Sequence, residues 1–114
     1  MDDDFILNME AFKMERKVLL ICAGGMSTSI LMKKMEKYAK ENGITLKIQA
    51  IGMSDYEDVY KDYDMILLGP QVSYKKESIK SITKMPVSVI AAYDYAVGNV
   101  KNIFNQIDSI YKTI

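Results

Sequence analysis

The sequence predicts an α/β fold, a single domain in which a four-stranded parallel sheet carries helices on both faces. Short apolar runs alternate with amphipathic segments four times along the chain, and the connections between them are short. The first and third runs lack the alternation of a half-exposed strand, which is typical of strands covered on both sides. A chain of 114 residues is long enough to bury one core and too short for two. Right-handed crossovers then place the helices on both faces.

Four segments are predicted to be strands. Residues 17–21, KVLLI, are apolar and partly β-branched, as expected of a central strand. Residues 45–52 alternate, and residues 64–69 form a third, buried run. Residues 86–92 are the fourth predicted strand. Pro86 is compatible with this because it stands at the start of the strand, where a missing N–H is tolerated.

The first two helices are predicted from their end signals. Ser27 or Thr28 is expected to cap a helix that Gly43 closes. The segment SDYE, residues 54–57, matches a capping box and predicts a short helix.

Periodicity predicts the last two helices. Residues 73–82 form a polar segment in which Ile79 and Ile82 are expected to face inward. The C-terminal helix is predicted from apolar residues three and four apart, at Val97, Val100, Phe104, Ile107 and Tyr111.

Composition excludes several classes of function. Fifteen basic and fifteen acidic residues give a formal charge of zero, so no nucleic-acid footprint is visible. Histidine is absent, which removes Ser-His and Cys-His catalysis and a phosphohistidine carrier. The single cysteine cannot form an internal disulfide and is a poor metal site, so we expect a reduced protein without cofactor or metal.

The N-terminal segment is expected to stand apart from the domain. Residues 1–15 are predicted to be a disordered or helical extension, and residues 16–114 the folded domain. The acidic start is unlike a signal peptide, and no apolar run reaches the length of a membrane span. We therefore expect a cytoplasmic protein without direct membrane insertion.

The junction after the first predicted strand carries the candidate chemistry. Cys22 stands at the carboxyl end of that strand, where ligands bind in open parallel sheets. Gly24 and Gly25 allow a tight turn around an anion, and the amides of the following helix start favour phosphate. Hydroxyl groups that could add donors follow at Ser27, Thr28 and Ser29.

The same environment favours thiolate over thiol at Cys22, and the thiolate is the nucleophile. The junction would therefore supply both a nucleophile and a cradle for phosphate, with phosphocysteine as the product. The structural alternative is an inert, well-packed core cysteine. The adjacent glycines and hydroxyls favour the functional interpretation.

Other phosphate-binding classes fit less well. The loop matches neither a Walker A motif nor G-x-G-x-x-G, which disfavours nucleotide binding. A cysteine phosphatase needs an arginine six residues after the cysteine, where this chain has Thr28; Arg16, the only arginine, lies before the strand, roughly 15–20 Å from the thiol. A receiver-type aspartate is also missing, because Asp62 and Asp64 precede the third strand. A phosphoryl relay is favoured, with a small cysteine-dependent phosphatase and a thiol-based anion- or redox-sensing module as alternatives.

Three segments together resemble a known family. KVLLICAGGMSTSILMKKMEKYAKENG, IGMSDYEDVYKDYDMILLGPQVSYK and MPVSVIAAYDYAVGN are similar to the IIB component of the lactose/cellobiose (and chitobiose) class of the bacterial phosphoenolpyruvate-dependent sugar phosphotransferase system. The resemblance covers residues 16–104 and implies a flavodoxin-like topology, shared with low-molecular-weight phosphatases. It also implies that a IIA phosphohistidine protein phosphorylates the loop cysteine, which passes the phosphate to a sugar at the IIC membrane channel. The implied sugar is a β-linked disaccharide such as cellobiose, chitobiose or lactose, and the implied location is the inner face of the membrane, through IIC.

Carried over by residue, the resemblance makes Cys22 the phospho-acceptor. The implied phosphate loop comprises Ala23, Gly24, Gly25, Met26, Ser27, Thr28 and Ser29. The implied neighbouring loop comprises Gly69, Pro70, Gln71, Val72 and Tyr74, with Gln71 and Tyr74 placed to approach phosphate or partners. Tyr93 and Tyr95 are interpreted as core-edge residues without chemistry, and Lys33, Lys37 and Lys40 as a solvated helix face.

Overall fold

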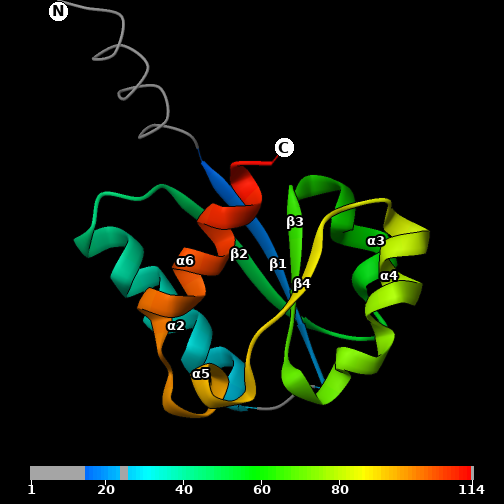
Figure 1. Ribbon diagram of the computed structural model, residues 1–114, viewed down its shortest axis with the longest axis horizontal. Coiled ribbons are helices and arrows are strands. Elements are labelled where there is room, and N and C mark those ends of the chain that lie inside the picture. Colours follow the sequence, from blue (N-terminus) through cyan, green and yellow to red (C-terminus); the bar gives the residue numbers. More distant parts are fainter. Residues whose placement is uncertain (1–14, 24–25, 114) are drawn as a thin grey trace, which may run out of the picture.

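The computed structural model describes residues 15–23 and 26–113; residues 1–14, 24–25 and 114 lie outside the described residues. The sheet is parallel and four-stranded, in the order β2-β1-β3-β4 (Figure 1). Its strands are β1 Arg16–Cys22, β2 Leu46–Gly52, β3 Met65–Leu68 and β4 Val87–Val89. The predicted α/β class and the central first strand are confirmed, although β4 is shorter than the expected 86–92. The extension over residues 1–15 stays a prediction.

Helices cover both faces of this sheet. On one side lie α2 (Met26–Glu41), α5 (Ala92–Val97) and α6 (Val100–Tyr111), and on the other lie α3 (Tyr56–Val59) and α4 (Lys76–Thr83) (Figure 1). Two 3-10 segments, η1 (Tyr60–Asp62) and η2 (Pro70–Lys75), follow α3 and β3.

The apolar run of β1 belongs to two cores. Val18, Leu20 and Cys22 pack with residues of α2 and α6, including Met35 and Phe104. Leu19 and Ile21 pack in a separate cluster with residues of β3, α3 and α4. Because successive strand side chains point to opposite faces, an unbroken apolar run is what this double burial requires. Cys22 therefore faces α2, α5 and α6.

The end signals of the helices were only partly confirmed. Gly43 has a φ of 66°, the left-handed conformation expected of a residue that closes a helix. The predicted cap at Ser27 or Thr28 is wrong, because α2 begins at Met26 and both residues lie inside its first turn. The capping box is wrong as well: Asp55 occupies the N-cap position of α3 and makes no side-chain cap hydrogen bond.

One inward-facing residue of α4 was also predicted wrongly. Ile79 is fully buried, but Ile82 is 48% exposed, and Thr83 is buried in its place. Ile79 and Thr83 are four residues apart and share a face, whereas Ile82 falls beside it. The hydroxyl of Thr83 is accommodated because it donates to the carbonyl of Ile79 at 2.8 Å.

The predicted C-terminal helix is two helices. Gly98 adopts a φ of 67° at the end of α5, and α6 starts at Val100. Val97 therefore belongs to α5 and is exposed, contrary to the prediction. The remaining periodic residues keep the predicted pattern, with Phe104, Ile107 and Tyr111 buried on α6.

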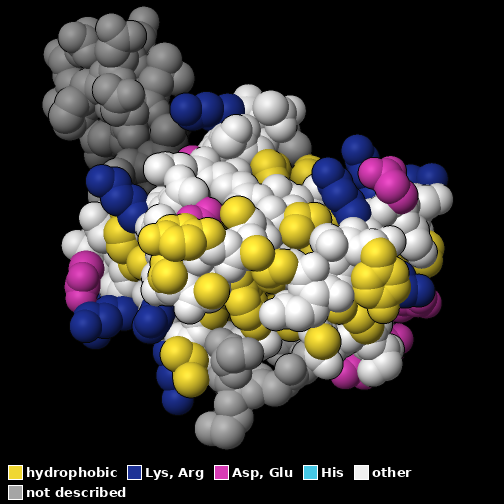
Figure 2. Space-filling view, turned by 60° about the horizontal axis from the view of Figure 1, so that its bottom comes forward, with side chains coloured by type: hydrophobic (Ala, Val, Ile, Leu, Met, Phe, Trp, Pro, Cys, Tyr) yellow, Lys and Arg dark blue, Asp and Glu magenta, His cyan; other side chains and the backbone are white. Residues whose placement is uncertain are grey.

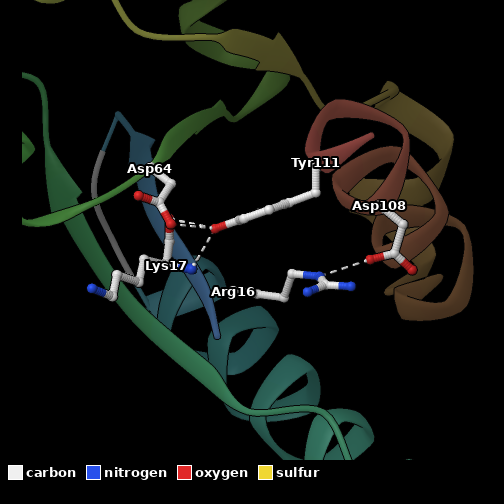
Figure 3. A network of polar contacts seen from close by, with 5 residues as sticks. All are labelled: Arg16, Lys17, Asp64, Asp108 and Tyr111. Atoms are coloured by element: carbon white, nitrogen blue, oxygen red, sulfur yellow. Dashed lines mark hydrogen bonds and ion pairs between the residues drawn. The ribbon is translucent and has the colours of Figure 1, made fainter. Parts of the chain in front are cut away.

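A polar network joins α6 to the amino edge of the sheet (Figure 3). The Tyr111 hydroxyl accepts from the backbone N–H of Lys17 at 2.7 Å and donates to Asp64 Oδ2 at 2.9 Å. Arg16 pairs with Asp108 at 3.1 Å, and its guanidinium lies over the Tyr111 ring, 4.9 Å from the centroid. Burial raises the pKa of Tyr111 to about 12, and the bond to Asp64 adds to the rise. This network fixes the end of the domain opposite to Cys22.

Candidate functional site

Cys22 ends the central strand at the carboxyl edge of the sheet. β1 lies between β2 and β3, so the strand order reverses beside it, which is where open parallel sheets bind ligands. In the β1–β2 register Cys22 lies opposite Gly52, and in the β1–β3 register Ile21 lies opposite Leu68. The predicted placement of the thiol at a strand-to-helix junction is confirmed.

The Cys22 side chain is 1% exposed. On the β3 side it is covered by Gly69, whose amide extends the sheet by donating to the Ile21 carbonyl at 2.9 Å. A Cβ atom on Gly69 would lie 2.9 Å from the Cys22 sulfur and 3.1 Å from Gln71 Oε1. The backbone of Gly69 has an ordinary φ of −62°, so glycine is required here for space beside the sulfur, not for conformation.

Tyr95 reaches the sulfur from the other side. Its hydroxyl donates to Cys22 Sγ at 3.9 Å and lies 3.3 Å from the hydroxyl of Thr28, which is 4% exposed. Sequence reasoning assigned Tyr95 no chemistry. No local signal would have found it, because 73 residues separate the tyrosine from the cysteine.

A buried carboxylate sets the position of α5, which carries Tyr95. Asp94 accepts from the side-chain amides of Asn99 at 3.2 Å and Asn102 at 2.6 Å, one on each oxygen. The backbone N–H of Asn99 also donates to the Asp94 carbonyl at 2.9 Å. These bonds fold α5 back against the start of α6 through the left-handed turn at Gly98.

The predicted phosphate loop is described only in part. Ala23 forms an exposed bend after β1, and Ser29 is exposed on α2. Gly24 and Gly25 lie outside the described residues, as do the side chains of Met26 and Ser27, although both residues belong to α2. The phosphate cradle therefore stays a prediction.

The predicted neighbouring loop begins beside the sulfur and runs away from it. Pro70 opens η2, Gln71 is exposed with its carboxamide oxygen close to Gly69, and Val72 is buried. Tyr74 is exposed. The structure thus brings Gly69 and Gln71 to Cys22, while no contact joins Tyr74 to the thiol among the described interactions.

The arginine expected of a phosphatase is absent from the site. Arg16, the only arginine in the chain, begins β1 and pairs with Asp108 at the amino edge. Arg16 was predicted to precede the strand and is instead its first residue, at the end away from Cys22. The lysines Lys33, Lys37 and Lys40 are exposed on α2, as predicted.

The face at the carboxyl edge carries many apolar side chains (Figure 2). Ile30 on α2 and Tyr93 and Val97 on α5 are large exposed apolar residues. Beside them is a hollow of about 220 Å³, lined by Ile30, Leu31, Lys34, Tyr95, Ala96 and Gly98. Such a surface next to the thiol is suited to contact with another protein.

Within residues 15–23 and 26–113, none of the helices combines the length and the apolar character needed to cross a bilayer.

Comparison with known proteins identifies the family. Residues 17–106 match the family described as "PTS system, Lactose/Cellobiose specific IIB subunit". The oligo-beta-mannoside-specific EIIB component of Bacillus subtilis is 33% identical over 80% of this chain and 91% of its own. The cellobiose-specific EIIB component of Lactococcus lactis is 35% identical over 73% of this chain and 84% of its own.

Solved structures agree with this assignment. The cellobiose-specific IIB component of Borrelia burgdorferi is 32% identical and superposes with a TM-score of 0.73 over 88% of this chain and 94% of its own. The lactose-specific IIB domain of Streptococcus pneumoniae has the same fold, with a TM-score of 0.71 at 19% identity over 81% of this chain and 97% of its own. The chain has a thiol at the switch point of a flavodoxin-like parallel sheet, and the matches extend over most of this chain and most of its relatives. The chain therefore belongs to the lactose/cellobiose-specific IIB subunits of the sugar phosphotransferase system and is a phosphotransferase component.

Proposed function

We propose that Cys22 is the phospho-acceptor of this subunit, taking a phosphoryl group from a IIA phosphohistidine and passing it to a sugar at a IIC membrane channel. The observation that carries the proposal is the position of the thiol at the carboxyl end of the central strand, at the switch point and directly before α2. The chain itself contains no histidine, so the phosphohistidine must come from a partner.

Each transfer is a displacement at phosphorus. In the first step the Cys22 sulfur attacks phosphorus, a P–S bond forms and the P–N bond of the phosphohistidine breaks. The imidazole takes the electron pair of that bond and, in balance, the proton lost by the thiol. In the second step a sugar hydroxyl attacks, a P–O bond forms and the P–S bond breaks. The sulfur takes the electron pair and, in balance, the proton lost by the hydroxyl. The thiol is regenerated unchanged.

The only arginine of the chain, Arg16, pairs with Asp108 at the amino edge of the sheet. It is therefore not placed to speed hydrolysis of a phosphate on Cys22. The resting thiol is covered, and a relay requires that a phosphocysteine also be kept from water. Because the sulfur is 1% exposed, we expect its cover to open when the phosphate donor binds. The amides of Ala23 to Ser29 are the proposed phosphate cradle, and Gly69, Pro70, Gln71, Val72 and Tyr74 the proposed second wall.

The proposed IIC partner is supported by relatives named as lactose-specific EIICB components. That of Staphylococcus haemolyticus is 38% identical over 60% of this chain, which corresponds to 12% of its own length. The apolar face around Ile30, Tyr93 and Val97 is the proposed contact surface for the partners.

The proposed sugar class is the β-linked disaccharides. Relatives of similar identity are named for oligo-beta-mannoside, galactose and cellobiose, at 33%, 36% and 35%. Identity alone therefore does not choose among sugars, and the proposal rests on what most of these names share.

Incubation with IIA carrying radiolabelled phosphohistidine tests the acceptor. We expect the label on the Cys22 peptide of the wild-type chain and none on the Cys22→Ser variant. Tyr38→Phe, about 15 Å from Thr28 along α2, is a matched control that should be labelled normally. Label that persists in Cys22→Ser, or that maps to another residue, contradicts the proposal. Membrane vesicles containing IIC then test the sugar class, with cellobiose expected to discharge the label and the α-linked disaccharide maltose expected to leave it.

A further inference from the structure

We propose that Tyr95 is a positioning residue for the transfer, the middle member of a chain of hydroxyl groups that runs from Thr28 through Tyr95 to the Cys22 sulfur. The proposal rests on the proposed function for its biological meaning, but the geometry of the resting thiol carries it. The two contacts are the 3.3 Å approach of the Thr28 and Tyr95 hydroxyls and the 3.9 Å bond from Tyr95 to Sγ.

The direction of the chain follows from the number of protons available. A tyrosine hydroxyl has one proton to donate and lone pairs with which to accept. In the proposed chain the Tyr95 hydroxyl donates to the sulfur and the Thr28 hydroxyl donates to Tyr95. The 3.3 Å contact between the two hydroxyls allows either direction, and this one leaves the Tyr95 proton for the sulfur. A donor chain of this kind is polarised toward its end, so Thr28 strengthens the bond that Tyr95 makes.

The chain is held in place by buried parts of the fold. Thr28 is buried in α2, and Tyr95 is carried by α5, which the bonds from Asn99 and Asn102 to Asp94 fasten to α6. Both Asp94 oxygens accept from asparagines, and the Lys34 ammonium lies close to Gly98. The phenol is therefore the group on α5 that reaches the sulfur.

The hydrogen bond from Tyr95 is strongest when the Cys22 sulfur carries negative charge. The thiolate exists before it attacks and again when the phosphoryl group leaves, and a hydrogen bond to an ionised acceptor is stronger than one to a neutral acceptor. Tyr95 therefore donates most strongly to the charged sulfur and fixes the direction in which a sulfur lone pair points. Gly69, which follows β3, also lies against the sulfur, so residues from two parts of the chain restrict its position.

Alkylation of Cys22 by iodoacetamide tests this without any partner protein. In Tyr95→Phe we expect the rate at pH 7 to fall about threefold to tenfold and the alkylation profile to move to higher pH, because a donor to the charged form is lost. At high pH the variant should react at least as fast as wild type, since a less stabilised thiolate is a stronger nucleophile. A merely structural role would not give this pattern: looser packing speeds alkylation at every pH. The control is Tyr93→Phe, on the same helix but 71% exposed, which should leave the profile unchanged.

The isosteric Thr28→Val variant tests the order of the chain. We expect a smaller shift in the same direction in Thr28→Val alone and no further shift when it is added to Tyr95→Phe, because Thr28 acts through the phenol. Additive shifts in the double variant, or a Tyr95→Phe profile identical to wild type, overturn the proposal. Thermal melts accompany each variant, and Thr28→Val provides a second reading of the chain should Tyr95→Phe fold poorly.

The rate of labelling by phosphorylated IIA separates this proposal from the proposed function. Label absent from Cys22 in the wild-type chain defeats the relay, while the alkylation profiles still decide the role of Tyr95. Normal labelling of wild type together with unchanged profiles in Tyr95→Phe defeats only the positioning role. A labelling rate that falls in Tyr95→Phe but not in Tyr38→Phe supports both.

Discussion

Gly69→Ala should destabilise the protein through one close contact, between the new Cβ and the Cys22 sulfur. The new Cβ would lie 2.9 Å from Cys22 Sγ, roughly 0.6–1.1 Å inside the 3.5–4.0 Å at which such atoms are most favourably placed. The backbone is not the obstacle, because a φ of −62° and a ψ of 152° suit alanine. Sulfur and its strand are buried, so the overlap must be relieved by moving a packed side chain or the end of β3.

The magnitude follows from two opposing effects. Inserting a methyl group into a packed core costs about 1–3 kcal/mol. Replacing glycine by alanine in an allowed conformation returns about 0.4–1 kcal/mol by restricting the unfolded chain. We therefore expect a net loss of about 0.5–2 kcal/mol in the free energy of unfolding, measured by urea denaturation.

A double-mutant cycle assigns this loss to the sulfur. In a Cys22→Ala background the overlap is absent, because the remaining close atom, Gln71 Oε1, ends a flexible exposed side chain. Gly69→Ala should then be neutral or stabilising, which gives a coupling energy of about 1–3 kcal/mol. Gly52→Ala is the matched control: Gly52 ends β2 opposite Cys22 with nothing within 4 Å of its Cβ position, so its effect should stay within about 0.5 kcal/mol. Equal losses from Gly69→Ala in both backgrounds would refute the reasoning.

Two further predictions concern the rest of the fold. Tyr111→Phe should lower the free energy of unfolding by about 1–2 kcal/mol at pH 8, because the backbone N–H of Lys17 loses its acceptor. The raised pKa of about 12 means that the fold favours the protonated phenol, so this contribution is fully present below pH 10 and is lost as pH rises from 10 through 12; wild type and variant should converge in denaturation curves over that range. On α4, Ile79→Ala should cost about 2–5 kcal/mol and Ile82→Ala within about 0.5 kcal/mol, because only Ile79 is buried; similar urea midpoints for both would contradict the packing described.

The position of Cys22 in the fold was predictable because it depends on local patterns. An unbroken apolar run indicates a strand covered on both faces, and a thiol at its carboxyl end lies at the edge where parallel sheets bind ligands. The neighbouring loop was predictable in part. Gly69 and Gln71 follow the strand beside β1, so topology alone brings them to Cys22. Tyr74, a few residues further along η2, has no such constraint and lies exposed.

The role of Tyr95 was not predictable in this way. An alternating or periodic pattern reports which face of an element is apolar, but not which distant side chain that face meets. The left-handed turn at Gly98 splits the predicted last helix, and the bonds from two asparagines to Asp94 then direct the short α5 toward the thiol. Neither feature alters the hydrophobic period.

Sequence by itself therefore determined the class of fold, the central strand, the glycine that closes α2 and the place of the thiol, because each depends on neighbouring residues and on the topology of parallel sheets. Only the tertiary structure decided how closely Gly69 and Tyr95 contact the sulfur. Those contacts join residues 47 to 73 positions apart, and the packing of whole elements, not the propensity of any segment, brings them within hydrogen-bond and van der Waals distance.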